Sequence, residues 1–324
     1  MNLSKITQYK KNKNNHFIYY LKNFLSYSLP DFLYQSYLST ELKKISNYDE
    51  NDIMNRVNYY NKLENITNLC ENKVLLKDFQ LKEINKFRPT THFFDTYKYS
   101  RYFSKDNFIS LLFGDNISIP VCPSIVKSRP ILKNNENAIL LKLNALRHFM
   151  FVNDKKKIDS KKDMLVGRCA IYQPQRIKFW EIYFGHPMCN LGQTSLNPIF
   201  NEKWMTPNMS IAEHLNYKFI LCLEGNDVAT NLKWVMSSNS LAVMPKPKYE
   251  TWLMEGKLIP DFHYIEIKDD YSDLIEKLNY YIKNTAEAIK ISENANKFIR
   301  QFQDKQKEKL ISLLVLKKYF DFVK

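Results

Sequence analysis

The sequence predicts an α/β protein with at least one parallel sheet. From about residue 160 onward, short apolar segments alternate with segments of helical periodicity. Only six of the 324 residues are glycine, and Gly114, Gly167 and Gly225 each follow an apolar, strand-like run. Glycine in so glycine-poor a chain is expected where φ is positive or where backbones approach closely. Strands that alternate with helices form parallel sheets, which bind ligands at the carboxyl ends of their strands.

Composition indicates an ordinary globular chain. With 324 residues, 44% apolar and 25% charged, it can form one large or two medium domains. The longest apolar runs fall well short of the roughly 20 residues that a membrane-spanning helix needs. The N-terminal "MNLSKITQYKKNKNN" has no apolar segment directly behind it, unlike a secretory signal. We therefore expect a cytoplasmic protein.

The cysteines predict neither disulfides nor a metal site. They are five in number, scattered and without a CxxC pair, which is typical of a reducing compartment. His186 and Cys189 form an isolated H-x-x-C without the two further ligands that zinc requires, so a turn is expected there. We expect no metal and no cofactor.

The charge predicts an anionic partner. The formal net charge is +14, with five lysines and no acid in the first 30 residues and five more lysines in "NDKKKIDSKKD". Nucleic acid, an anionic membrane face and phosphorylated substrates all fit, and so does a merely solvated lysine-rich surface.

Residues 1–90 are predicted to be helical. Phe17, Tyr20, Leu21, Phe24 and Leu25 recur at helical spacing. This amphipathic, aromatic and basic stretch either packs against the domain that follows or lies on an anionic bilayer.

The remaining elements follow in order. Residues 91–153 resemble short strands and loops, and the lysine-rich segment 154–163 resembles a domain seam. The expected strands are 163–168, 217–225, 241–247 and 262–269, and the expected helices are 175–184, 231–239, 250–256, 271–284, 285–302 and 304–322.

Two strand-to-helix loops are candidate phosphate sites. "EGNDVATN" precedes a helix with Lys233 in its first turn, and "VGRCAIYQPQR" carries Arg168 after a strand and Arg176 near a helix start. Surface ion pairs for the arginines, and a turn with an N-cap at Asn226 and Asp227, explain the same residues. GxGxxG and P-loop motifs are absent from the sequence, which argues against nicotinamide dehydrogenases and Walker-type NTPases. There is also no Asp-x-Asp triplet to hold a metal diphosphate.

Asp115 is the candidate general base. It follows an apolar strand and a glycine in "LLFGDNISIP", and a partly desolvated carboxylate there can accept a hydroxyl proton. A turn aspartate is the alternative.

Several segments together resemble glycosyltransferase family 90, in particular its bacterial lipopolysaccharide core transferases. They are "SIVKSRPI", "AILLKLNALRHFMFV", the stretch from "EHLNYKFILCLEGNDVATNLKW" to "FHYIEIKDDYSDL", and "LISLLVLKKYF". The similarity covers about residues 90–320 and is densest over 213–274.

The resemblance implies a GT-B-like architecture, with two Rossmann-like domains facing a cleft, a helical N-terminal region and C-terminal helices. The expected domains are 1–160 on the acceptor side, 161–303 for the nucleotide-sugar, and a final helix, 304–324, that packs back on the first domain. The implied reaction is inverting and metal-independent, with a UDP-sugar as donor.

The family's motifs are similar to this chain at named positions. The catalytic aspartate matches Asp115. A "G-S-R-T-x-x-x-R" loop is similar to "VGRCAIYQPQR", and an "R-G-V-A-A-S-F-R" loop is similar to "NDVATNLK". Where the family has arginines in the second loop, this chain has Asn226 and Lys233, which cannot make the same bidentate phosphate contacts. The implied donor-binding residues are Arg168, Arg176, Asn226, Asp227, Val228, Ala229, Thr230, Asn231, Lys233 and Glu250.

The hypothesis from sequence is therefore a transferase that moves a hexose from a UDP-sugar to a hydroxyl of the lipopolysaccharide core. An anionic glycolipid acceptor at the cytoplasmic membrane face accounts for the positive charge, and peripheral contact with that membrane fits the basic N-terminus. Transfer to capsule, another glycan or a protein hydroxyl is the alternative. A non-catalytic nucleic-acid-binding protein is disfavoured because the cations follow strand ends and no nucleic-acid-binding motif occurs.

Overall fold

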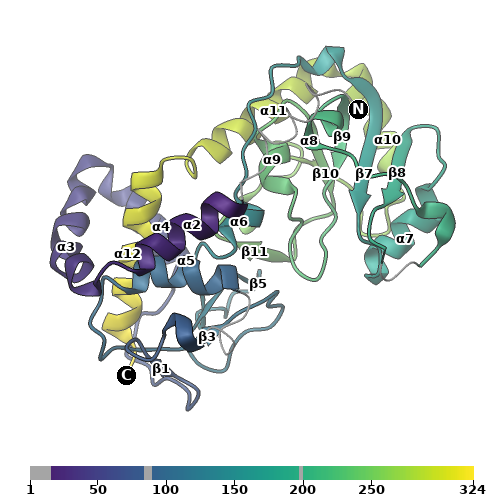
Figure 1. Ribbon diagram of the computed structural model, residues 1–324. Coiled ribbons are helices and arrows are strands. Elements are labelled where there is room, and N and C mark those ends of the chain that lie inside the picture. The colour runs from purple at the N-terminus through teal and green to yellow at the C-terminus, as the bar shows by residue number, and fades with distance from the viewer. Residues whose placement is uncertain (1–15, 84–89, 197–199) are drawn as a thin grey trace. The chain divides into compact units, whose positions relative to one another are not determined.

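The protein consists of two compact units of mixed α/β structure (Figure 1), which confirms the predicted class. The computed structural model describes residues 16–83, 90–196 and 200–324. Unit 1 comprises residues 147–247 and 257–301, and unit 2 comprises residues 15–146, 248–256 and 302–324. The segment 248–256, expected in the nucleotide-sugar domain, thus groups with the N-terminal part of the chain and the final helix.

Unit 1 is built on a five-stranded parallel sheet. Its strands lie in the spatial order β12-β10-β9-β7-β8. When the five strands are numbered 1 to 5 along the chain and the order is given from the β8 edge, it is 2-1-3-4-5, a doubly wound arrangement. The strands are β7 (Lys162–Cys169), β8 (Cys189–Gln193), β9 (Tyr217–Leu221), β10 (Leu241–Met244) and β12 (Ile265–Glu266). The helices are α7 (Pro174–Tyr183), α8 (Ile211–His214), α9 (Leu232–Met236), α10 (Leu274–Lys283) and α11 (Thr285–Arg300).

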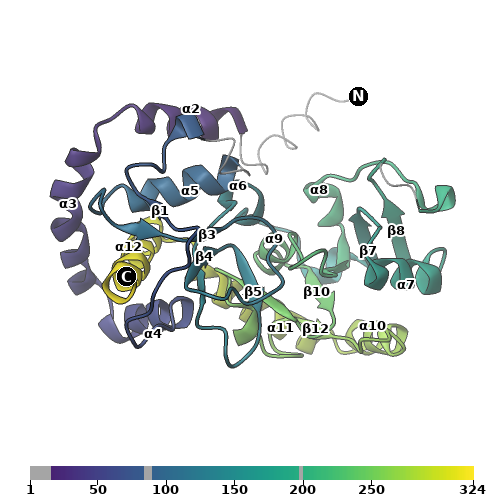
Figure 2. The same ribbon diagram turned by 90° about the horizontal axis from the view of Figure 1, so that it is seen from below.

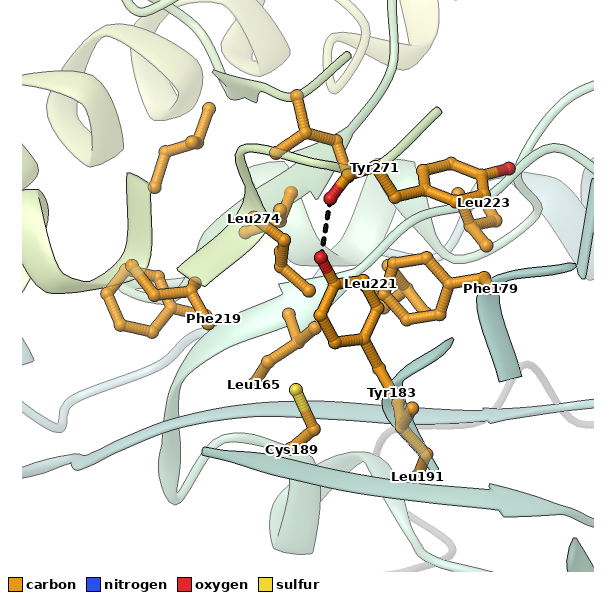
Figure 3. Close-up of a cluster of buried hydrophobic side chains, with 14 of the residues drawn as sticks. Leu165, Phe179, Tyr183, Cys189, Leu191, Phe219, Leu221, Leu223, Tyr271 and Leu274 are labelled. Atoms are coloured by element: carbon orange, nitrogen blue, oxygen red, sulfur yellow. Dashed lines mark hydrogen bonds between the residues drawn. The ribbon is translucent and has the colours of Figure 1, made fainter. Parts of the chain in front are cut away.

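One face of this sheet carries the main core of unit 1 (Figure 3). Side chains of alternate strand positions, such as Leu165, Phe219 and Leu221, pack against α7 and α10. Tyr183 in α7 donates a hydrogen bond from its hydroxyl to the backbone oxygen of Tyr271, at 2.6 Å. This contact joins α7 to the loop before α10. Of the remaining helices, α8 contacts β9, and α9 and α11 both contact β10.

Unit 2 is mainly helical around small sheets. Its helices are α2 (His16–Tyr27), α3 (Asp31–Lys43), α4 (Glu50–Tyr60), α5 (Thr90–Ser100) and α12 (Lys305–Phe322), and the boundary between the two units falls within the short helix α6 (Ala145–His148). Its strands are β1 (Val74–Leu75), β2 (Phe108–Ile109), β3 (Leu111–Leu112), β4 (Ser124–Val126), β5 (Ser128–Pro130), β6 (Ala138–Leu140) and β11 (Tyr249–Thr251). The strands β3, β4 and β6 form a parallel sheet, and β1-β2 and β5-β11 form antiparallel pairs.

The final helix is part of the unit 2 core. Figure 2 shows α12, in yellow, beside α4 and α5, and α12 contacts both of these helices. Asp304 caps α12 by accepting hydrogen bonds from the backbone N–H groups of Gln306 and Lys307. Ile311 and Tyr319 on this helix are fully buried.

The predicted helix 250–256 is wrong. Tyr249–Thr251 is instead the strand β11, which places Glu250 opposite Arg129 in β5. The Glu250 carboxylate accepts hydrogen bonds from Arg129 Nε, at 2.8 Å, and from the Tyr59 hydroxyl. Because both members of the Arg129–Glu250 pair are buried, this long-range ion pair overrides the local helical pattern.

The expectation of five reduced cysteines is also wrong. Cys70 and Cys122 form a disulfide in unit 2, with their Cα atoms 5.8 Å apart and a sequence separation of 52 residues. Cys169, Cys189 and Cys222 are free thiols. The cysteine pattern therefore no longer supports a reducing compartment. The turn predicted at His186 is confirmed, since Cys189 donates its backbone N–H to the His186 oxygen at 2.9 Å.

No helix in the described parts of the chain is both long and apolar enough to cross a membrane.

Replacing Glu250 with Ala should strongly destabilise unit 2. The substitution leaves the Arg129 guanidinium buried without its counter-ion, which costs about 3–5 kcal/mol of unfolding free energy in comparable cases. Denaturant titration followed by circular dichroism measures this change. The control is Asp321→Ala, which breaks the exposed Lys317–Asp321 pair and should cost at most about 0.5 kcal/mol. Equal effects of the two substitutions would contradict this account of the Arg129–Glu250 pair.

Candidate functional site

The topology of unit 1 predicts a ligand-binding position between two loops, which we call the crevice. Strand order reverses between β7 and β9, so the chain segments that leave their carboxyl ends turn to opposite faces of the sheet. The segment after β7 leads through Gln173 into α7, and the segment after β9 runs from Cys222 to Asn231 before α9. These are the two loops that the sequence indicated.

Arg176 joins these two loops. It lies in the first turn of α7 and donates three hydrogen bonds to backbone oxygens. Its Nε contacts Glu224 at 3.1 Å, its Nη1 contacts Ala170 at 3.0 Å, and its Nη2 contacts Leu223 at 3.0 Å. Gly225 permits this approach, because a Cβ atom at this position would lie 3.1 Å from Nη2. The half-buried guanidinium thus forms one wall of the crevice.

Two glutamines that no sequence pattern indicated extend the same contact. Gln175 donates its side-chain amide to the backbone oxygen of Gly225 at 2.8 Å, and Gln173 donates its amide to Asn226 Oδ1 at 3.1 Å. The Gln173 side chain is buried, and its Oε1 has no hydrogen-bond partner within the described residues. A buried acceptor without a partner costs free energy unless a ligand supplies a donor. Both glutamines lie within the quoted "VGRCAIYQPQR". The sequence therefore placed them in this loop but did not indicate their hydrogen bonds to the segment after β9.

The loop after β9 is largely buried. Asp227, Val228 and Ala229 are buried and Thr230 is half-buried. Asn231 donates its side-chain amide to the backbone oxygen of Leu221 at 2.9 Å, which ties the end of the loop to β9.

Lys233 lies beneath this loop and not on its surface. Its side chain is fully buried in α9, a helix of five residues. Its charge acts on Cys222, the first residue after β9, where burial raises the pKa of the thiol and Lys233 opposes that rise. The positive charge of Lys233 is therefore close to the base of the crevice.

Arg168 points away from the crevice. Its guanidinium contacts the backbone and side-chain oxygens of Asn190, both at 2.7 Å. Asn190 pairs with Val166 in β7. Val166 lies four residues, or roughly 13 Å of strand, before Ala170, which Arg176 contacts. Arg168 and Arg176 therefore lie apart, and the structure does not bring them together as a pair. Glu250 belongs to unit 2, where Arg129 and Tyr59 occupy its carboxylate.

A second candidate site lies at the carboxyl edge of the small parallel sheet in unit 2. The strands β3 and β4 are adjacent and parallel, so the residues that follow them meet at one edge. Gly114, directly before Asp115, has a φ of +111°, a conformation that side-chain-bearing residues rarely adopt. Asp115 forms an ion pair with Lys127, which follows β4. The Asp115 side chain is 37% exposed, whereas that of Lys127 is only 2% exposed, so the carboxylate is the solvent-accessible member of the pair.

His92 lies next to this ion pair. It is buried in α5, with its ring 5.4 Å from that of Phe113. Burial and the positive charge of Lys127 together lower the pKa of His92 to about 4, although Asp115 opposes the decrease. His92 is therefore neutral at neutral pH. Lys127 lies within the quoted "SIVKSRPI", but nothing in the sequence indicated His92.

Within the described residues, no group of three or more His, Cys, Asp and Glu side chains lies close enough together to hold a metal ion.

Comparison with known proteins assigns the chain to a family. The family model for glycosyl transferase family 90 matches residues 193–323, which include the loop after β9. The O-glucosyltransferase LpsA of Dichelobacter nodosus is 42% identical over 275 residues, covering 84% of this chain and 83% of LpsA. The uncharacterized protein 179R of Invertebrate iridescent virus 6 is 30% identical over 141 residues, covering 37% of this chain and 12% of that protein.

An alignment of this identity over most of both chains, together with the match of the family model, shows common descent. The chain belongs to glycosyltransferase family 90.

Proposed function

We propose that this glycosyltransferase moves a hexose from a UDP-sugar to a hydroxyl of the lipopolysaccharide core, with inversion and without a metal ion. The observation that carries the proposal is the strand-order reversal of unit 1, with Arg176 joining the two loops that leave the sheet there. The similarity to an O-glucosyltransferase, LpsA, supports glucose as the sugar.

In this proposal the diphosphate of the donor lies against the start of α7. A guanidinium has five N–H groups, and the three hydrogen bonds from Arg176 to backbone oxygens leave two of them over. Those two can reach phosphate oxygens, in charge-assisted hydrogen bonds worth roughly 1.5–3 kcal/mol each. Gln173 Oε1 accepts a hydrogen bond from an N–H or O–H group of the UDP-sugar. The positive charge of the buried Lys233 also favours binding of the diphosphate.

The loop after β9 supplies the other wall in this proposal. The residues involved are Asn226, Asp227, Val228, Ala229, Thr230 and Asn231. Arg168 and Glu250 receive no donor-binding role, because Asn190 occupies the guanidinium of Arg168 and Arg129 and Tyr59 occupy the carboxylate of Glu250.

Asp115 is the proposed general base. Its carboxylate takes the proton of the acceptor hydroxyl, and the hydroxyl oxygen attacks the anomeric carbon from the face opposite UDP. The bond from the anomeric carbon to the diphosphate oxygen breaks, and UDP leaves with the electron pair, stabilised by the positive charges of Arg176 and Lys233. The buried Lys127 holds the exposed carboxylate in position.

The proposed acceptor is anionic, which matches a chain with a net charge of +14. Such a glycolipid acceptor also implies a cytoplasmic enzyme that works at the inner face of the membrane.

Product analysis tests the function directly. The purified chain is incubated with UDP-glucose, UDP-galactose or other UDP-hexoses and truncated core oligosaccharides, with EDTA present. Mass spectrometry should show the gain of one hexose from one of these donors, and linkage analysis should show an inverted anomeric centre. Transfer only to capsule or protein acceptors would contradict the acceptor, and loss of all transfer in EDTA would contradict metal independence.

Replacing Arg176 with Ala should weaken UDP binding by about a hundredfold or more, since two charge-assisted hydrogen bonds of roughly 1.5–3 kcal/mol each are lost. Calorimetry measures the change. The matched control is Gln175→Ala, which removes hydrogen bonds to the same loop without removing a charge and should weaken binding only a few-fold. Unchanged affinity in Arg176→Ala would rule out the proposed phosphate contact.

Replacing Asp115 with Asn should lower kcat by about two to four orders of magnitude while UDP affinity is retained. The control Asp106→Asn changes an exposed carboxylate of the same unit and should leave kcat unchanged. Wild-type turnover in Asp115→Asn would show that another group is the base.

A further inference from the structure

The helix α2 has an outward face composed of large apolar side chains. Phe17 is 72% exposed and Leu25 is 63% exposed, and Ile18, Leu21 and Phe24 are each about half exposed. Phe24 lies at the edge of this face, because its ring also packs edge-on against Phe94, with the ring centres 5.2 Å apart. At 3.6 residues per turn, these five positions fall within an arc of about 120°. A contiguous apolar surface of this kind marks an interaction site.

The opposite face of α2 is firmly attached to unit 2. Tyr19 donates its hydroxyl to Asp95 at 2.8 Å. The ring of Tyr20 packs edge-on against Phe94, and the ring of Tyr27 lies 4.9 Å from that of Tyr97. Because these aromatic contacts fix the rotation of the helix, the outward side chains cannot turn into the core.

Two further exposed apolar side chains follow α2 in the chain. Leu29 and Phe32 follow in the chain and are 49% and 65% exposed. We call the α2 outward face together with these two residues the apolar ridge. Lys22 lies at its border, about 40° of helix rotation beyond Ile18.

The acidic side chains of the segment that carries the ridge are paired with cations. From residue 16 to residue 48 the sequence contains only two acids, Asp31 and Glu41. Asp31 is paired with Arg101 and Lys105, and Glu41 is paired with Lys44 and Lys309. The fifteen residues before α2 contain four lysines and no acid. An anionic partner is therefore attracted to this end of the chain.

We propose that the apolar ridge docks on an anionic lipid bilayer, with α2 lying in the plane of the surface. Apolar side chains flanked by lysines suit the boundary between headgroups and acyl chains, where burial and attraction to anionic lipids add together. The biological purpose, to bring the enzyme to a glycolipid acceptor, rests on the proposed function. The docking itself does not.

Vesicle co-sedimentation tests this docking. The full chain should bind vesicles of phosphatidylcholine with phosphatidylglycerol at least about tenfold more tightly than pure phosphatidylcholine vesicles, and less tightly at high salt. The double variant Leu21→Glu, Leu25→Glu should lower binding by about tenfold or more. The matched control, Leu132→Glu with Ile259→Glu, makes the same kind of change at two sites that are each 53% exposed, and should bind like the wild type.

Several outcomes would overturn the proposal. Wild-type vesicle binding by the Leu21, Leu25 variant would exclude the ridge, and equal binding to neutral vesicles would exclude the electrostatic part. Ultracentrifugation without lipid that shows a dimer lost only in this variant would make the ridge an interface between two copies of the chain. UDP calorimetry on the same variants keeps failure of the docking distinct from failure of the proposed function.

Discussion

The geometry of the candidate donor site depends on one guanidinium. Arg176 gathers the backbone oxygens of Ala170, Leu223 and Glu224, which belong to two loops that leave the sheet in opposite directions. Without it, carbonyl groups at the ends of β7 and β9 would lose hydrogen bonds at a point where the sheet no longer supplies them. A lysine could not substitute, because only the planar fork of arginine presents several donors in fixed directions. The same side chain therefore shapes the crevice and lines it.

Two ion pairs of unit 2 show how exposure separates structural from catalytic roles. Arg129 and Glu250 are both buried, and the arginine gives its remaining hydrogen bonds to the backbone oxygens of Tyr59, Tyr60 and Ala138. That pair joins β11 to β5 and has no exposed face. In the pair of Lys127 and Asp115, by contrast, the cation is buried and the carboxylate is half-exposed. Only the second pair can offer its acid to a substrate.

Local periodicity made much of the fold predictable. The strands β7, β9 and β10 and the helices α7, α10, α11 and α12 lie where the apolar pattern indicated, because each is specified by neighbouring residues. The glycines also marked real constraints, a positive φ at Gly114 and a close contact at Gly225.

Features set by distant contacts were not predictable. The disulfide of Cys70 with Cys122, the strand at Glu250 and the ion pair of Lys127 with Asp115 depend on residues that only the folded chain brings together. The same holds for Arg168, whose spacing fitted a phosphate site but whose guanidinium contacts Asn190.

The order of the segments along the chain has a consequence for biosynthesis. The chain passes between the two units after Leu146, Pro247, Gly256 and Gln301. During translation, most of unit 2 leaves the ribosome first, yet its core stays open until α12 follows unit 1 out of the exit tunnel. In the meantime apolar surface that α12 later covers is exposed to chaperones and to aggregation. Neither unit can be produced as a single contiguous fragment, so the protein folds completely only as a whole.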